Sequence, residues 1–233
     1  MQKTFVSTIA VTFLGLLLLS GCQKEKITIS GELNGYSYVD LGLPSGTLWA
    51  TCNVGANDSE DEGNCYAWGE TRTKGYYDWS NYKYGQEGEW SLYGFWHEGH
   101  VNKYCDNSVF GIDGFTDYLT RLLASDDVAT VVWGEGWRMP TKNEWDELMT
   151  ECSWKETKYR GTYGILFTSD NGNSIFMPSS SCRVWYSSSL YTEPICAFGV
   201  EYIIDEHGGH LVMAQVDRAY GAYVRPVCVS RKN

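Results

Sequence analysis

Four histidines form two pairs whose members stand three residues apart, a spacing that suits ligands of a transition-metal ion. His97 and His100 form one pair, and His207 and His210 form the other. Imidazole nitrogens bind zinc, copper, iron and nickel. Both pairs, however, lie in glycine-containing turns and not on a helix that would aim the two rings at one point. The sequence therefore predicts no metal ion and no cofactor, with a metal-dependent binding protein as an alternative.

Acidic side chains are concentrated in residues 57–63, where their density resembles that of a calcium loop. Asp58, Glu60 and Asp61 supply carboxylates, but Glu62 stands where an EF-hand requires glycine. No glutamate follows at the position that closes such a loop. We expect these residues to form a solvated acidic loop.

The motifs of common enzymes are absent from the sequence. It contains no Gly-x-Ser-x-Gly turn, no phosphate-binding glycine loop and no His-Glu-x-x-His segment. Two carboxylates for glycoside hydrolysis can come from segments far apart, so the sequence leaves that chemistry open. The chain is also strongly acidic, with a net charge of −11, which repels the phosphate backbone of nucleic acids. We expect a protein without catalysis and without a nucleic-acid partner.

Residues 75–104 are rich in glycine and aromatic residues and show neither a helical nor a strand period, which indicates a long ordered loop. Its candidate ligand-binding residues are Trp79, Trp90, Tyr93 and Trp96. Aromatic rings can stack on a sugar face while nearby polar side chains bind its hydroxyls. In the alternative interpretation the rings pack beneath the loop. The expected ligand is a glycan or a surface protein.

The N-terminus has the order of an export signal, with Lys3, an apolar stretch over residues 5–19 and small residues before Cys22. The apolar stretch is too short to span a bilayer comfortably. We therefore interpret residues 1–21 as a signal peptide, 22–30 as a tether and 31–233 as a single domain.

The four residues that end at Cys22, Leu-Ser-Gly-Cys, resemble the bacterial lipobox. The resemblance implies cleavage before Cys22 and a lipid, including palmitate, on that cysteine, which makes the membrane a partner. Gln23 at the next position suggests the outer membrane, by analogy with other bacteria. The protein is thus expected to be extracytoplasmic, on a membrane face that the sequence leaves open.

Seven further cysteines, at positions 52, 65, 105, 152, 182, 196 and 228, follow Cys22. An oxidising compartment would allow disulfides to persist. The number is odd, so at least one thiol stays free or pairs between chains, and the connectivity stays open. There is no Cys-x-x-Cys pair, which argues against a zinc site or a redox motif.

The helices that position these residues are expected in the middle of the chain. Residues 115–124 have apolar side chains at helical spacing, and 126–132 are expected to form a short turn with Ser125 as its N-cap. Thr141 and Glu144 have the spacing of a capping box, which predicts a helix directly after Pro140.

Strands are predicted on both sides of these helices from turn residues and period-two patterns. The expected strands are 36–43 with 47–51, 65–68, 164–169 with 174–177, 195–204 with 211–216, and 222–229. Pro226 suggests an edge or a bulge in the last strand. Because helices come early and antiparallel hairpins late, we expect an α+β fold.

Several runs of residues together resemble a known family. They are 38–43 with 46–50, 53–56, 66–71, 137–141 with 144–145, 185–189 and 224–227. In this order they are similar to the Fibrobacter succinogenes major paralogous domain, which is typical of exported lipoproteins of gut bacteria. The resemblance implies an envelope or cell-surface protein that recognises a glycan or a protein, or that has a structural role.

Residues 137–141, Trp-Arg-Met-Pro-Thr, are also similar, more distantly, to the formylglycine-generating enzymes. That resemblance implies a C-type-lectin-like α+β fold with few short helices, antiparallel β hairpins and long loops. Those enzymes need a reactive cysteine pair and a metal, and the surroundings of Cys182, Cys196 and Cys228 do not match that motif. An enzyme of this type is therefore kept only as an alternative.

The shared motifs are expected to stabilise the fold, since large aromatic side chains with one polar atom are typical of cores. This interpretation applies to Trp49, Trp68, Trp133, Trp137 and Arg138. The Arg138 guanidinium is expected to be partly buried against backbone carbonyls or a carboxylate such as Glu144 or Glu70.

Overall fold

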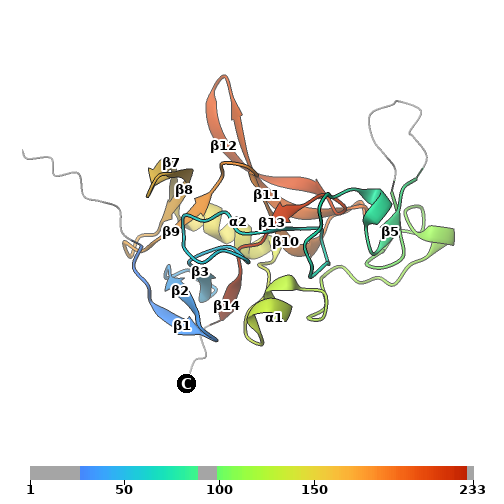
Figure 1. The fold of residues 1–233 in the computed structure, drawn as a ribbon, viewed down its shortest axis with the longest axis horizontal. Coiled ribbons are helices and arrows are strands. Elements are labelled where there is room, and N and C mark those ends of the chain that lie inside the picture. Colours follow the sequence, from blue (N-terminus) through green and yellow to red (C-terminus); the bar gives the residue numbers. More distant parts are fainter. Residues whose placement is uncertain (1–26, 89–98, 230–233) are drawn as a thin grey trace, which may run out of the picture.

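Strands predominate in the computed structural model, which describes residues 27–88 and 99–229 (Figure 1). In these two ranges fourteen strands form four sheets. The helices within them are η1 (Trp79–Asn81), η2 (Ile112–Gly114), α1 (Val128–Trp133) and α2 (Lys142–Glu151).

The first sheet joins the two ends of the described chain. Its antiparallel order is β1 (Gly31–Leu33), β2 (Tyr36–Asp40), β3 (Thr47–Ala50) and β14 (Val227–Val229). Asn34 and Gly35 connect β1 to β2 with φ values of 52° and 84°, the left-handed conformations that a tight hairpin turn requires. The predicted hairpin between residues 36 and 51 is confirmed.

The second sheet contains the longest hairpin. Its order is β12 (Gly208–Asp217), β11 (Cys196–Asp205), β10 (Val184–Leu190), β13 (Ala222–Tyr223) and β4 (Cys65–Tyr66). The β11–β12 hairpin projects from the body of the molecule (Figure 1), and its existence was predicted. The predicted strand 222–229 instead divides at Pro226, which has no N–H for a ladder, so its two halves join different sheets.

Two smaller sheets complete the fold. One consists of β7 (Ser153–Tyr159), β8 (Thr162–Thr168) and β9 (Ser174–Pro178), and the other of β5 (Gly85–Gln86) and β6 (His100–Val101). The β8–β9 hairpin was predicted from its Asn-Gly turn and is confirmed. β7 was not predicted, because its mostly exposed and polar residues give little apolar signal.

Helix α2 begins as predicted with a capping box. The Thr141 side chain accepts a hydrogen bond from the Glu144 N–H, and the Glu144 carboxylate accepts one from the Thr141 N–H at 2.8 Å. Trp145 is fully buried, and its ring meets that of Trp49 edge to face at 4.8 Å. The cap and this contact fix where the helix starts and which face it buries.

The predicted helix over residues 115–124 is wrong. Asp117 instead accepts hydrogen bonds from the backbone N–H groups of Tyr104, Cys105 and Leu119. Tyr118 has a φ of 56°, which no right-handed helix contains. A local carboxylate that satisfies backbone donors competes directly with the helix that the apolar spacing suggested.

The helix predicted from Ser125 begins later than expected. Asp127, and not Ser125, caps α1, and its Oδ1 accepts from the N–H groups of Ala129 and Thr130. Its Oδ2 accepts from Met139 N–H at 2.8 Å. This carboxylate therefore also ties α1 to the segment that leads into α2.

The expected α+β, C-type-lectin-like fold is contradicted by these elements. The molecule is β-rich, with four sheets and two short α-helices in the residues that the structure describes. One expected helix is absent, and the strands β1, β7 and β10 add to the predicted hairpins. The expected order of early helices and late hairpins is not observed, because β1 to β6 precede α1 and residues 115–124 form irregular chain around the hydrogen bonds of Asp117.

Two arginines are fully buried, an unusual position for a charged side chain. Arg218 donates to the hydroxyl of Tyr82 and to the carbonyl oxygens of Lys103, Tyr104 and Pro194. The guanidinium thereby joins segments of the chain that are far apart in sequence and stabilises the loop that contains Tyr82.

Arg225 donates in the same way to the Asn53 side chain and to the carbonyl oxygens of Ala50 and Phe176. Burial lowers the pKa of Arg225 to about 10.

The aromatic residues expected in the core are indeed buried; they are Trp49, Trp68, Trp133 and Trp137.

Candidate functional site

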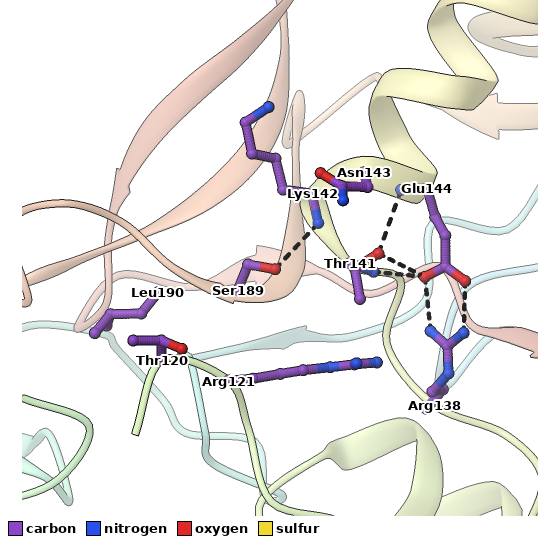
Figure 2. A pocket seen from close by; sticks show the side chains of 9 residues that line it. All are labelled: Thr120, Arg121, Arg138, Thr141, Lys142, Asn143, Glu144, Ser189 and Leu190. Carbon is purple, nitrogen blue, oxygen red and sulfur yellow. Dashed lines mark hydrogen bonds and ion pairs between the residues drawn. The ribbon is translucent and has the colours of Figure 1, made fainter. Parts of the chain in front are cut away.

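An open pocket of about 600 Å³ lies at the start of α2 (Figure 2). Its lining residues are Thr120, Arg121, Arg138, Thr141, Lys142, Asn143, Glu144, Ser189 and Leu190. They come from three segments: the irregular chain before α1, the first turn of α2 with the residues that precede it, and the end of β10.

Backbone pairing holds Arg138 at one wall of the pocket. Its N–H donates to Val227 O at 3.0 Å, and its carbonyl accepts from Val227 N–H at 2.8 Å. The guanidinium then makes a two-pronged contact with the Glu144 carboxylate, at 2.7 and 2.5 Å. The expectation that Arg138 binds Glu144 is confirmed, and the pair fixes the entrance to α2.

Glu144 is committed to this structure through both of its oxygens. One oxygen accepts from Arg138 and from the Thr47 hydroxyl, and the other from Arg138 and from the N–H and hydroxyl of Thr141. Burial acts to raise the pKa of Glu144, but the hydrogen bonds from Arg138 and Thr141 outweigh it and lower the pKa to about 2. Such a carboxylate is a poor proton donor near neutral pH.

The opposite wall is built by residues 120–122 and the end of β10. Leu190 N–H donates to Thr120 O at 2.9 Å, and Leu122 N–H donates to Ser188 O at 3.0 Å. Ser189 Oγ accepts from the backbone N–H of Lys142 at 3.1 Å. The three segments around the pocket are therefore linked to one another by hydrogen bonds.

Arg121 supplies an uncommitted positive charge to this pocket. Its side chain extends across the pocket toward Arg138 (Figure 2), and it has no side-chain partner within the described residues. Arg138 is paired with Glu144, and Lys142 forms an ion pair with Asp146. Of the three cations that line the pocket, Arg121 is thus the one whose donors are open to a ligand.

The polar side chains of the pocket can bind a ligand that is rich in oxygen. Hydroxyl groups come from Thr120 and Ser189, and an amide comes from Asn143, whereas the Thr141 hydroxyl is already bound to Glu144. Hydroxyls and amides both donate and accept hydrogen bonds. With Arg121 beside them, this set suits a ligand that carries hydroxyl groups and a negative charge.

Trp79, the one predicted ligand-binding residue that lies within the described part of the chain, does not line this pocket. Trp79 is buried, with 3% of its surface exposed, and its indole N–H donates to Asp217 Oδ2 at 3.0 Å. A Cβ at Gly99 would lie 2.5 Å from the Trp79 ring, so the chain passes closely over it. Trp79 therefore packs beneath its loop.

Three of the predicted ligand-binding residues, Trp90, Tyr93 and Trp96, lie outside the described residues, as do the expected lipid-bearing Cys22 and His97 of the first histidine pair.

The second histidine pair does not converge on one point. His210 contacts Asp205 at 3.2 Å and His207 contacts Glu206 at 3.6 Å, all on the exposed hairpin turn. In the described part of the chain no group of three or more His, Cys, Asp and Glu side chains could hold a metal ion.

The acidic loop makes more contacts than a solvated loop would. Glu62 accepts from the Ser181 N–H at 2.7 Å and from the Tyr223 hydroxyl at 2.9 Å. Glu60 forms an ion pair with Arg160 at 3.2 Å. The loop therefore contacts residues that lie a hundred or more positions away in the sequence.

Sequence reasoning missed the pocket because its walls meet only in the folded chain. The Tyr-Ser-Ser run around Ser189 and the segment around Arg138 were noted, but nothing in the sequence singled out Thr120 or Arg121. Arg121 is recognised only in the folded chain, where a short backbone bridge pairs it with Ser189.

No family model, no curated protein and no solved structure matches this chain. Within residues 27–88 and 99–229, no helix has the length and hydropathy needed to cross a membrane.

Proposed function

We propose that the protein is a non-catalytic recognition module whose pocket at the start of α2 binds an acidic carbohydrate, such as one with a uronic acid. The observation that carries this proposal is the Arg121 guanidinium, which lines the pocket and has no side-chain partner within residues 27–88 and 99–229. A guanidinium binds a carboxylate through two parallel hydrogen bonds. The hydroxyl and amide groups around it can bind the hydroxyls of the same sugar.

The size and charge of the pocket support this class of ligand. A volume of about 600 Å³ lies within the usual range for small-ligand sites. The chain as a whole carries a net charge of −11, so it has no general attraction for anionic ligands. A preference for a negatively charged ligand would therefore come from Arg121 in the pocket.

The lowered pKa of Glu144 favours ligand recognition over hydrolysis of a glycan. A glycosidase needs two carboxyl groups, one of them protonated near neutral pH. Glu144 is the one carboxylate among the lining residues, and hydrogen bonds lower its pKa to about 2. The same pairing makes Glu144 a support for Arg138 and α2.

We further propose that this module is extracytoplasmic and anchored by a lipid to a bacterial membrane. Residues 1–21 would act as the export signal and Cys22 as the lipid-bearing residue, as the similarity to the lipobox implies. The similarity to the Fibrobacter succinogenes major paralogous domain supports the same setting.

The test is binding of the full chain, in detergent, to an array of neutral, uronic-acid and sulfated glycans, followed by titration with the best ligand. We expect selective binding of uronic-acid glycans without added calcium. Arg121→Gln should weaken the affinity by about tenfold, the value for the loss of one charge-assisted contact at a partly exposed site. Arg160→Gln, which changes an exposed arginine away from the pocket, should leave the affinity unchanged.

Equal binding of neutral and acidic glycans by the native chain would contradict the role of charge. An Arg121→Gln variant with native affinity would place the ligand elsewhere. A blank array would favour a protein partner over a glycan.

A further inference from the structure

Two cysteine thiols, those of Cys65 and Cys182, lie side by side in the structure. The Cys65 thiol and the Cys182 sulfur are in hydrogen-bond contact. Both side chains are partly exposed, whereas the other five described cysteines are buried. Among the described thiols these two are therefore both adjacent to each other and open to reagents in solution.

The backbone around the pair explains why the two thiols meet. Cys65 lies in β4 directly opposite Tyr223 of β13. The N–H of Tyr223 donates to the Cys182 sulfur. In the sheet, β13 lies between β10 and β4. Cys182 comes two residues before β10 begins, so it is not held in the β10 ladder and can approach Cys65 in β4.

Glu62 of the acidic loop also connects the segment before Cys65 to the segment before Cys182. Glu62, three residues before Cys65, accepts from the N–H of Ser181, the residue before Cys182, at 2.7 Å. Its other oxygen accepts from the Tyr223 hydroxyl at 2.9 Å. The contact between the thiols is thus surrounded by four backbone and side-chain interactions and does not depend on two flexible side chains alone.

We propose that Cys65 and Cys182 form a disulfide when the chain meets a disulfide oxidant. The Cys182 thiolate attacks one sulfur of the oxidant, forms a mixed disulfide and releases the other half as a thiolate. Cys65 then loses its proton and attacks the Cys182 sulfur of the mixed disulfide. The S–S bond of the protein forms, and the second half of the oxidant leaves as a thiol.

The order of attack follows from the contact between the two sulfurs. The hydrogen bond from Cys65 outweighs burial and lowers the pKa of Cys182 to about 7, whereas the same contact and burial raise the pKa of Cys65. The thiolate is the nucleophile in disulfide exchange. Cys182 therefore reacts first near neutral pH, and Cys65 closes the bond.

Peptide mapping of the full chain after incubation with oxidised glutathione tests the proposal. Trypsin releases residues 161–183 with Cys182 alone, and residues 27–72 with both Cys52 and Cys65. We expect a species in which these two peptides are cross-linked. Cys52→Ser should keep the cross-link, and Cys65→Ser should abolish it.

Melting gives a second readout that does not depend on the variants. The bond would close a loop of about 120 residues, so reduction of the oxidised chain with dithiothreitol should lower the melting temperature by about 10 °C. Cys152→Ser, which changes a buried cysteine, should retain this difference between the oxidised and reduced chains. Glutathione on Cys65 and Cys182 separately, without a cross-link, would overturn the proposal, as would identical melting of the oxidised and reduced chains. Neither outcome depends on the sugar pocket.

Discussion

Replacement of Glu144 by glutamine tests how much the ion pair at the start of α2 stabilises the fold. The Glu144 pKa falls from 4.5 to about 2 because hydrogen bonds from Arg138 and Thr141 outweigh burial. This difference corresponds to about 3 kcal/mol of the free energy of unfolding. The exposed fractions of the two side chains are 27% for Arg138 and 12% for Glu144, so solvent screens the pair only in part.

The sign of the pH dependence follows from the lowered pKa. A carboxyl group whose folded pKa is lowered contributes stability that is fully present above its unfolded pKa and is lost as the pH falls toward the folded value. The native chain should therefore lose about 3 kcal/mol from this group between pH 5 and pH 2. Glu144→Gln should be less stable at pH 6 by about 2 to 3 kcal/mol and should lose that part of the slope.

Urea unfolding followed by tryptophan fluorescence at several pH values measures both effects. Asp146→Asn is the matched control, because Asp146 lies in the same helix and forms a more exposed ion pair with Lys142. It should cost less than about 1 kcal/mol. Equal losses in the two variants, or a Glu144→Gln variant with the native slope between pH 5 and pH 2, would refute the reasoning.

Two further predictions concern the buried arginine Arg218 and the proposed lipid on Cys22. Arg218→Met should lower the free energy of unfolding by about 3 kcal/mol or more, because it leaves the Tyr82 hydroxyl and three carbonyl oxygens without their donor. Thermal unfolding measures it, and a change below about 1 kcal/mol would show that water replaces the guanidinium. Cys22→Ser should release the protein from the membrane fraction of expressing cells. A variant that still sediments with membranes would argue against a lipid on Cys22.

The parts of the fold that were predicted correctly depend on contacts between residues close in sequence. The capping box of Thr141 and Glu144 and the Asn-Gly turn between β8 and β9 are complete within a few residues. Such signals do not need knowledge of the rest of the chain. The positions of β2, β3, β11 and β12 followed from similar local patterns.

The incorrect predictions come from contacts between distant residues. The helix expected over 115–124 is replaced by irregular chain because Asp117 binds backbone donors at Tyr104 and Cys105. The α+β fold class, which was expected from early helices and late hairpins and from the C-type-lectin-like resemblance, is contradicted by the predominance of strands. Apolar spacing is the same whether the chain coils or folds over a neighbouring segment, so it could not distinguish the two.

The pocket was beyond sequence reasoning for the same reason. Arg121 and Ser189 are paired through the backbone although they lie 68 positions apart in the numbering. Glu144 was among the partners expected for Arg138, but only the folded chain shows that Arg121 has no side-chain partner within the described residues. The sequence shows that residue 121 is an arginine, but it does not show that its guanidinium is open to a ligand.

The pairing of β3 with β14 also means that the first sheet is complete only after the last described strand has been synthesised. β3 is buried along its whole length, and one of its two hydrogen-bonding edges is closed only by Val227–Val229. During synthesis on the ribosome, this edge of β3 stays unpaired until almost two hundred further residues have been added. An unpaired strand edge can pair with another chain and start aggregation. A chain truncated before Val227 should therefore be a target of quality-control proteases, and a holding chaperone would act on the nascent form by covering β3.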